Sequence, residues 1–197
     1  MKKRLSIVIM AHPERKKFIP YLKEMLGDVP VVWDQKNNIW DTCRRAWLAQ
    51  DPACEYGLVI QDDAVICKNF RRKAERILAV KRPQDYIYSF YAGHLLTSRI
   101  GKAIRDKEDF VISSMIVNEV ALAMRTEHIE PMVKFCDERQ STTDQDITKW
   151  AHQKRLPIYY TVPSLVDHRD DESLYRKIFN KPQSDRPRRA ALFIGNL

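Results

Sequence analysis

The chain has 197 residues, which is enough for one domain with a hydrophobic core of its own. It carries 34 lysines and arginines against 26 acidic residues, and the net charge of +8 favours a polyanionic or phosphorylated partner. The four cysteines form no CxxC pair, which argues against zinc and disulfide frameworks and favours the cytoplasm. The apolar run Ile7–Met10 is too short for a signal peptide or a membrane span.

The N-terminal third predicts a β-α-β unit. Apolar runs at residues 6–10 and 29–33 predict two buried strands, and apolar side chains at helical spacing over residues 18–26 predict the helix between them. Polar side chains follow both strands, namely His12, Arg15 and Asp34. Because parallel strands end at the same edge of a sheet, we expect these side chains to face one crevice.

The central strand is predicted at Leu58–Ile60, after a helix over residues 39–49. This all-apolar run suits a strand that is buried on both faces of a parallel sheet. It is followed by two adjacent carboxylates, Asp62 and Asp63. Two like charges at a strand end repel each other, but they become favourable when a divalent cation lies between them and a phosphate-bearing ligand.

A strongly basic helix is predicted over residues 68–82. Seven basic side chains lie outside its apolar stripe, against Glu75 alone: Lys68, Arg71, Arg72, Lys73, Arg76, Lys81 and Arg82. A face of this kind can follow a polyanion such as DNA. A second basic stretch ends the chain and contains Arg176, Lys177, Lys181, Arg186, Arg188 and Arg189.

The C-terminal half predicts further strands at residues 85–91, 110–115, 120–124 and 157–162. Residues 93–109 read as an irregular loop with a short helix, and longer helices are expected over 127–137 and 144–154. A polar turn at residues 140–143 precedes the last of these helices. Its first turn carries Asp144 and Asp146, where the helix dipole favours anions. The last strand leads into a segment that contains Asp167, His168 and Arg169.

The order of these features resembles small GT-A-type glycosyltransferases of bacteria and bacteriophages. The landmarks are the loop after the first strand, the acid after the second strand, Gln61-Asp62-Asp63 in the position of the DxD motif, Asp144-Gln145-Asp146 before a helix, and the late histidine segment. The resemblance implies a single α/β, Rossmann-like domain over residues 1–175, with a mostly parallel mixed sheet flanked by helices, and a basic tail over 176–197. Gln61 departs from the motif, because an acid is expected there.

The resemblance also implies a set of site residues. Asp63 and His168 would hold Mn²⁺ or Mg²⁺, and Asp146 would act as the base that deprotonates the acceptor. A nucleotide-sugar, most simply a UDP-sugar, would be bound by Ala11, His12, Arg15, Asp34, Arg44, Asp62 and Arg169. A metal that bridges the diphosphate stabilises the charge that develops on the leaving group.

The acceptor stays open at this point. A cell-surface polysaccharide and a hydroxymethylated DNA base both offer a hydroxyl group, and the basic helix and tail favour DNA, as in DNA-modifying bacteriophage glycosyltransferases. A non-catalytic nucleic-acid-binding protein would use the basic surface but would leave Asp62, Asp63 and His168 unexplained. A nucleotidyltransferase would need a further acid and a glycine-rich phosphate loop, and only five glycines occur in the sequence.

Overall fold

The computed structural model describes residues 4–139, 142–170, 173–178, 180, 182 and 188–196. The strands are β1 (Leu5–Ala11), β2 (Val31–Trp33), β3 (Tyr56–Gln61), β4 (Ala64–Ile66), β5 (Ile87–Ser89), β6 (Phe110–Ser113), β7 (Ala121–Arg125), β8 (Ile158–Thr161) and β9 (Val166–His168). The α-helices are α1 (Ile19–Leu26), α2 (Ile39–Leu48), α3 (Phe70–Ala79), α4 (Thr97–Asp106), α5 (Ile129–Asp137), α6 (Thr143–Lys154) and α7 (Leu174–Ile178). Short 3₁₀ helices are η1 (Pro13–Phe18), η2 (His94–Leu96), η3 (Thr126–His128) and η4 (Ile194–Asn196).

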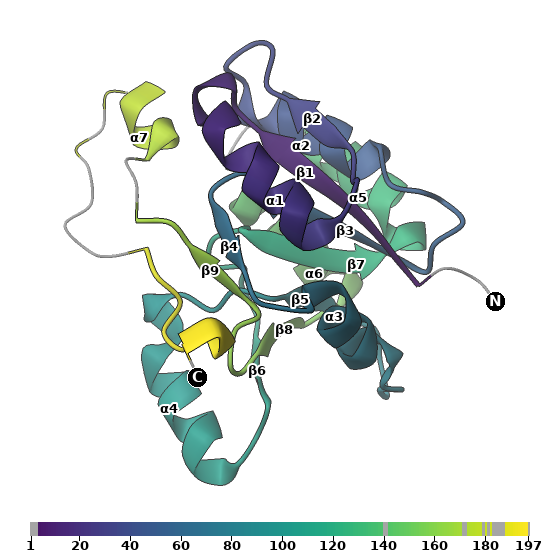
Figure 1. The fold of residues 1–197 in the computed structure, drawn as a ribbon. Coiled ribbons are helices and arrows are strands. Elements are labelled where there is room, and N and C mark those ends of the chain that lie inside the picture. Colours follow the sequence, from purple (N-terminus) through teal and green to yellow (C-terminus); the bar gives the residue numbers. More distant parts are fainter. Residues whose placement is uncertain are drawn as a thin grey trace.

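A seven-stranded mixed sheet with the order β2-β1-β3-β7-β5-β8-β6 forms the centre of the molecule (Figure 1). β1 pairs in parallel with β2 and β3, and β5 pairs in parallel with β8. β7 is antiparallel to its neighbours β3 and β5, and β6 is antiparallel to β8. Five strands therefore run in one direction and two in the other, which confirms the predicted mostly parallel mixed sheet.

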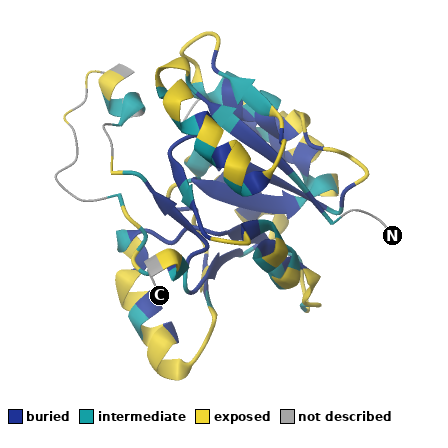
Figure 2. Ribbon diagram, viewed as in Figure 1, coloured by how far each residue is buried: buried dark blue, intermediate teal, exposed yellow. Residues whose placement is uncertain are grey.

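Helices cover both faces of this sheet because alternate side chains of the central strands are apolar in both directions. Leu58 and Ile60 of β3 pack with α1 and α3, whereas Val59 packs on the other face with α2, α5 and α6. Figure 2 shows the resulting arrangement, with a buried sheet between helices whose outer sides are exposed. The doubly buried central strand is as the sequence predicted.

The second sheet is small, and the sequence did not predict it. β4 begins just after Asp63 and pairs antiparallel with β9, so that Ala64 lies opposite His168. Three apolar residues without a turn signal do not identify a strand or its partner. The pairing carries the late histidine segment to the end of β3.

The remaining predictions of helices and strands are confirmed, with shifts at their ends. The segment over 93–109 is more regular than expected, because α4 occupies ten of its residues. Of the predicted polar turn, Gln140 and Ser141 lie outside the described residues, as do Lys181 and Arg186 of the predicted tail. In the part of the chain that is described, no helix is long and apolar enough to cross a membrane.

Candidate active site

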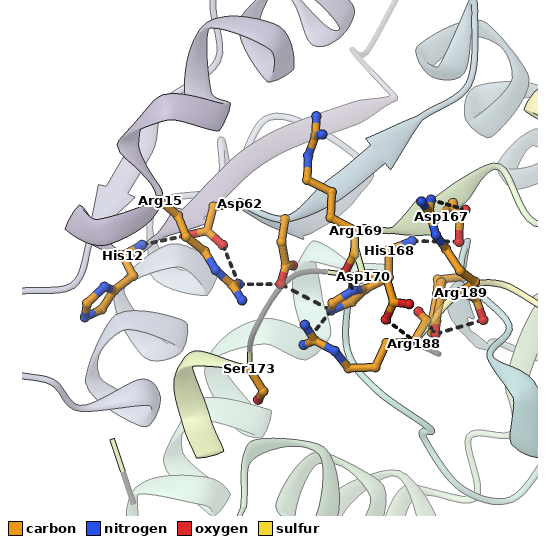
Figure 3. A network of polar contacts seen from close by, with 12 residues as sticks. His12, Arg15, Asp62, Asp167, His168, Arg169, Asp170, Ser173, Arg188 and Arg189 are labelled. Carbon is orange, nitrogen blue, oxygen red and sulfur yellow. Dashed lines mark hydrogen bonds and ion pairs between the residues drawn. The ribbon is translucent and has the colours of Figure 1, made fainter. Parts of the chain in front are cut away.

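The two adjacent carboxylates lie at the carboxyl end of β3, where both are almost fully buried. Asp62 accepts hydrogen bonds from the backbone N–H of His12 (2.7 Å) and from Nη1 of Arg15 (3.1 Å). The same Arg15 nitrogen also contacts Oδ2 of Asp63. The loop after β1 and the end of β3 thus meet, and the Arg15 guanidinium bridges both acids (Figure 3).

The late histidine reaches the same place from β9. Nε2 of His168 lies 3.2 Å from Oδ2 of Asp63, and Nδ1 of the ring faces the backbone oxygen of Arg169. A carbonyl oxygen only accepts, so Nδ1 carries the proton and the neutral ring keeps its lone pair on Nε2. Burial lowers the pKa of His168, and the nearby Arg188 lowers it further, although Asp63 acts in the opposite direction. The neutral form of the ring is therefore favoured.

Asp63 and His168 fit a divalent cation. The lone pair of Nε2 and a carboxylate oxygen of Asp63 face each other, an arrangement that a cation between them would make favourable. The other oxygen, Oδ1 of Asp63, is buried without a hydrogen-bond partner among the described residues. An oxygen of this kind is costly unless a ligand satisfies it. A carboxylate oxygen and an imidazole nitrogen are both common ligands of divalent cations in proteins.

Comparison with known proteins gives a fold and no relative by sequence. No protein-family model matches the sequence, and no curated protein matches it either. The catalytic domain of Drosophila β1,4-galactosyltransferase 7 in complex with xylobiose superposes with a TM-score of 0.52 at 10% identity, over 93% of this chain and 75% of that one. A protein from STIV superposes with a TM-score of 0.52 at 13% identity, over 86% of both chains. The chain has the GT-A fold.

Ala11 and Asp34, two further residues predicted to bind the nucleotide-sugar, lie beside His12. The backbone oxygen of Ala11 accepts from the N–H of Asp34 (2.7 Å), which joins the ends of β1 and β2. Asp34 is nearly buried, and its Oδ1 accepts from the N–H of Lys36 (2.9 Å). Both residues therefore lie at the edge of the sheet that carries Asp62.

Arg169 is held next to the acids through its backbone, because its N–H donates to the carbonyl oxygen of Asp63 (2.9 Å). Its guanidinium stacks on the rings of Phe18 and Tyr21, at 4.6 and 5.0 Å from their centroids. Its Nε is buried without a hydrogen-bond partner among the described residues. Arg44, by contrast, is not brought to the acids: its Nε donates to Asp137 (3.0 Å) at the end of α5.

The environment shifts the pKa of two of these groups. Burial and the neighbouring charge of Asp63 raise the pKa of Asp62 to about 6, against the opposing effects of Arg15 and the His12 N–H. Burial alone would lower the pKa of Arg15, but its pairs with Asp63 and Asp62 prevail and raise it. Arg15 is therefore a permanent cation, whereas Asp62 changes its charge close to neutral pH.

Asp146 lies in the first turn of α6, as predicted, but it is 4% exposed. Its Oδ1 pairs with Nζ of Lys149 at 3.2 Å, and its charge contributes, after burial, to raising the pKa of the Cys136 thiol to about 12. Asp146 therefore faces α5, whereas Asp144 is only half-buried. No described contact joins Asp146 to Asp62 or Asp63, so its role as a base stays a prediction.

Glu119 was not predicted as a site residue; it precedes the buried Val120, which leads into β7. Val120 accepts from the N–H of Gln61 (2.9 Å), so Glu119 lies at the active-site edge. The residue is partly exposed, but its carboxyl group contacts Thr143 and borders a small apolar space next to Met10 and Trp47. Burial and the charge of Asp144 raise the pKa of Glu119 to about 8. A lone acid inside an apolar stretch was the available signal.

Arg188 was not predicted as a site residue either, because the sequence placed it in the basic tail over residues 176–197. Its Nη1 lies 3.3 Å from Nε2 of His168 (Figure 3). Burial, followed by the charge of Arg15, lowers the pKa of Arg188, while Asp63 opposes this. No sequence pattern within the tail distinguishes this arginine from its neighbours.

Proposed function

We propose that this protein is a metal-dependent glycosyltransferase that moves a sugar from a nucleotide-sugar donor, most simply a UDP-sugar, to an acceptor hydroxyl. One observation carries the proposal: Nε2 of His168 and the carboxylate of Asp63, far apart in sequence, face each other 3.2 Å apart at the carboxyl end of β3. Open α/β sheets place their ligands at this edge. The GT-A fold supports a transferase of this class, since a solved neighbour is a galactosyltransferase.

The residues divide the work by their chemistry. Asp63 and His168 would hold Mn²⁺ or Mg²⁺, which supplies charge stabilisation to the departing diphosphate. Arg15 and Arg169 would orient the phosphates through charge-assisted hydrogen bonds. The end of β1 and Asp34, at the neighbouring strand end, would contact the nucleoside, and Asp62 would fix Arg15 and the sugar or ribose.

The acceptor hydroxyl must lose its proton as it attacks the anomeric carbon. Asp146 would accept this proton, because a carboxylate can act as a general base. Its burial and its pair with Lys149 mean that α6 would have to admit the acceptor to this acid. A single displacement of this kind inverts the configuration at the anomeric carbon.

For the acceptor, we propose a hydroxymethylated base in DNA, with a cell-surface polysaccharide as the alternative. The exposed Arg72 and Arg76 of α3 support a polyanion. Arg71 supports it less, because its guanidinium bonds to the carbonyl oxygen of Leu5 (3.0 Å) at the start of β1, the opposite end of that strand from His12. A duplex bound along α3 would therefore have to extend around the molecule to reach Asp63.

A donor-hydrolysis assay tests this proposal. The purified protein is incubated with Mn²⁺ and a panel of nucleotide-sugars, with and without hydroxymethylated DNA or oligosaccharides. We expect release of the nucleoside diphosphate from one donor, stimulated by one acceptor class and abolished by a chelator. Hydrolysis that is unaffected by the chelator, or DNA binding without any donor turnover, would refute the metal-dependent enzyme.

A further inference from the structure

The guanidinium of Arg15 contacts both acids of the site. Its Nη1 donates to Oδ1 of Asp62 (3.1 Å) and to Oδ2 of Asp63. Little of these side chains reaches water, because 12% of the Arg15 side chain, 6% of the Asp62 side chain and 1% of the Asp63 side chain is exposed. Charges in such a place are weakly screened, so the contacts of Arg15 affect what else the two acids can bind.

The oxygen of Asp63 that Arg15 contacts is also the oxygen that faces the histidine. Nε2 of His168 lies 3.2 Å from Oδ2 of Asp63, and Arg15 and His168 approach from different sides (Figure 3). A cation held between the ring nitrogen and this carboxylate would need Oδ2, since that oxygen faces the ring. Arg15 and the cation would then share one oxygen, and their positive charges would repel each other at short range.

The Arg15 side chain can leave Asp63 without a change in the core. Arg15 belongs to the 3₁₀ helix η1, whose six residues are exposed or half-buried. The backbone holds this turn in place, since the N–H of Arg15 donates to the oxygen of His12 (2.9 Å) and the N–H of His12 donates to Asp62 (2.7 Å). Neither of these bonds involves Asp63. A rotation of the Arg15 side chain would therefore release Asp63, while Asp62 remains its partner.

We propose that Arg15 and the divalent cation compete for Asp63, so that Arg15 sets how tightly the site binds metal. The inference rests on the proposed function, because it takes Asp63 and His168 as the metal ligands, and it adds a regulation of that site. Arg15 compensates the two buried acids, and it gives up Asp63 when the cation binds. By linkage, whatever draws the guanidinium away from Asp63 should tighten the binding of metal.

Arg189 provides a control for the loss of a positive charge near the site. Its Nη1 pairs with Oδ2 of Asp167 (3.0 Å), the residue before His168. Arg15→Gln and Arg189→Gln remove the same charge. Among the described contacts, only that of Arg15 is with the carboxylate of Asp63, so a difference between the two variants reports on this contact and not on the net charge.

The test measures metal binding rather than turnover. Binding of Mn²⁺ to the full chain, treated with a chelator and free of substrate, is followed by electron paramagnetic resonance for the parent and both variants. Coupling of this kind typically changes an affinity about 5- to 150-fold, so Arg15→Gln should bind Mn²⁺ more tightly by roughly that factor. Arg189→Gln should bind within about threefold of the parent. Equal affinity of folded Arg15→Gln and the parent would overturn the inference.

Melting temperatures provide a second comparison of the same proteins. In chelator, Arg15→Gln should melt below the parent, because two buried acids lose their counter-ion. Mn²⁺ should then raise the melting temperature of Arg15→Gln more than that of the parent, because a ligand stabilises the protein that binds it more tightly. An equal rise in both would contradict the competition.

A third measurement uses the parent and does not depend on the folding of a variant. The guanidinium of Arg15 and the ring of His168 are followed by ¹⁵N nuclear magnetic resonance while Mg²⁺ is added. Both signals should shift, and the guanidinium signal of Arg189 should not. A shift of His168 alone would overturn the inference and leave the metal site in place, whereas no shift of either would remove both. Mn²⁺ binding that depends on Arg15, without turnover of any donor, would support the inference and refute the nucleotide-sugar function.

Discussion

The two ends of β3 carry similar residues in opposite states. At its amino end, Asp85, Glu127 and His128 form the one group of three potential metal ligands found among the described residues. Asp85 is partly exposed and Glu127 is exposed. Asp85 pairs with Arg125 (2.8 Å) and lies 3.4 Å from His128, whose Nε2 is buried without a hydrogen-bond partner among the described residues. At its carboxyl end, Asp63 and His168 are buried, and an oxygen of Asp63 has no hydrogen-bond partner among the described residues. The difference lies in the acids: water can reach the carboxylates of the first group, whereas the buried, unsatisfied carboxylate oxygen of Asp63 points to a ligand.

The largest expected effect tests Asp146, the proposed base. Asp146→Asn keeps the shape of the side chain and removes its basicity, so transfer should fall about 10²–10⁴-fold while donor affinity stays within a few-fold. Asp144→Asn is the matched control and should cost far less, because Asp144 points away around the helix. Initial rates and the anomeric configuration of the product are measured. A retained configuration would remove Asp146 from the mechanism.

Substitutions at each end of β3 test directly which end binds the metal. Asp63→Asn and His168→Ala should each lower turnover by about 10²–10³-fold, as expected when charge stabilisation of a leaving group is lost. Both should also weaken Mn²⁺ binding, measured by electron paramagnetic resonance without substrate. The counterparts at the other end, Asp85→Asn and His128→Ala, should leave both readouts unchanged. If only Asp85→Asn and His128→Ala lost Mn²⁺ binding, the metal site would lie at the amino end of β3 instead.

Glu119, near the carboxyl end of β3, should make the stability of the protein depend on pH. Its pKa of about 8 in the folded protein lies above the ordinary value of 4.5, so the native state holds its proton more tightly than the unfolded state. Stability from this group is complete below about pH 4.5 and is lost as the pH rises to about 8. Glu119→Gln should therefore gain stability over the parent across this range, by roughly 2 kcal/mol after allowance for partial exposure. Chemical denaturation at pH 5 and pH 8 measures this difference, and an equal difference at both would contradict the buried acid.

The smallest effect on donor chemistry is expected from the basic face of α3. Replacing Arg71, Arg72 and Arg76 with Glu should weaken DNA binding and reduce the salt dependence by about one unit for each lost phosphate contact. Donor hydrolysis without an acceptor should be unchanged, because this face lies away from Asp63. Binding that is insensitive to salt, or equal in the variant, would leave a polysaccharide as the better acceptor.

Much of the fold could be predicted because burial leaves a pattern in the sequence. The all-apolar run of β3 and the helical spacing of α1 identify their elements without any knowledge of their partners. The residues at the strand ends, such as Arg15 and Asp62, followed from the rule that parallel strands end together. These are local properties, which can be read from the sequence without knowledge of the tertiary contacts.

The rest of the site depends on pairings that no local pattern encodes. Three-residue strands β4 and β9 find each other through a register that carries no signal in either segment alone. Arg188 cannot be told from Arg189 in the sequence. In the structure, the backbone contacts of residues 188–190 direct the Arg188 side chain to His168 and the Arg189 side chain to Asp167. Arg44 is the opposite case: it was expected at the site, but it pairs with Asp137, and nothing in the sequence indicates that these two residues are close.

The pairing of β4 with β9 also has a consequence for how the protein forms. Asp63 precedes β4, whereas His168 ends β9, and contacts between such distant segments form late because the chain must first close a long loop. Arg15 and Asp62 belong to the β1 and β3 portion of the chain, so their ion pair needs no contact with β9. The proposed ligand pair of Asp63 and His168, in contrast, is complete only after β4 and β9 have paired, so we expect any metal site there to form late in folding.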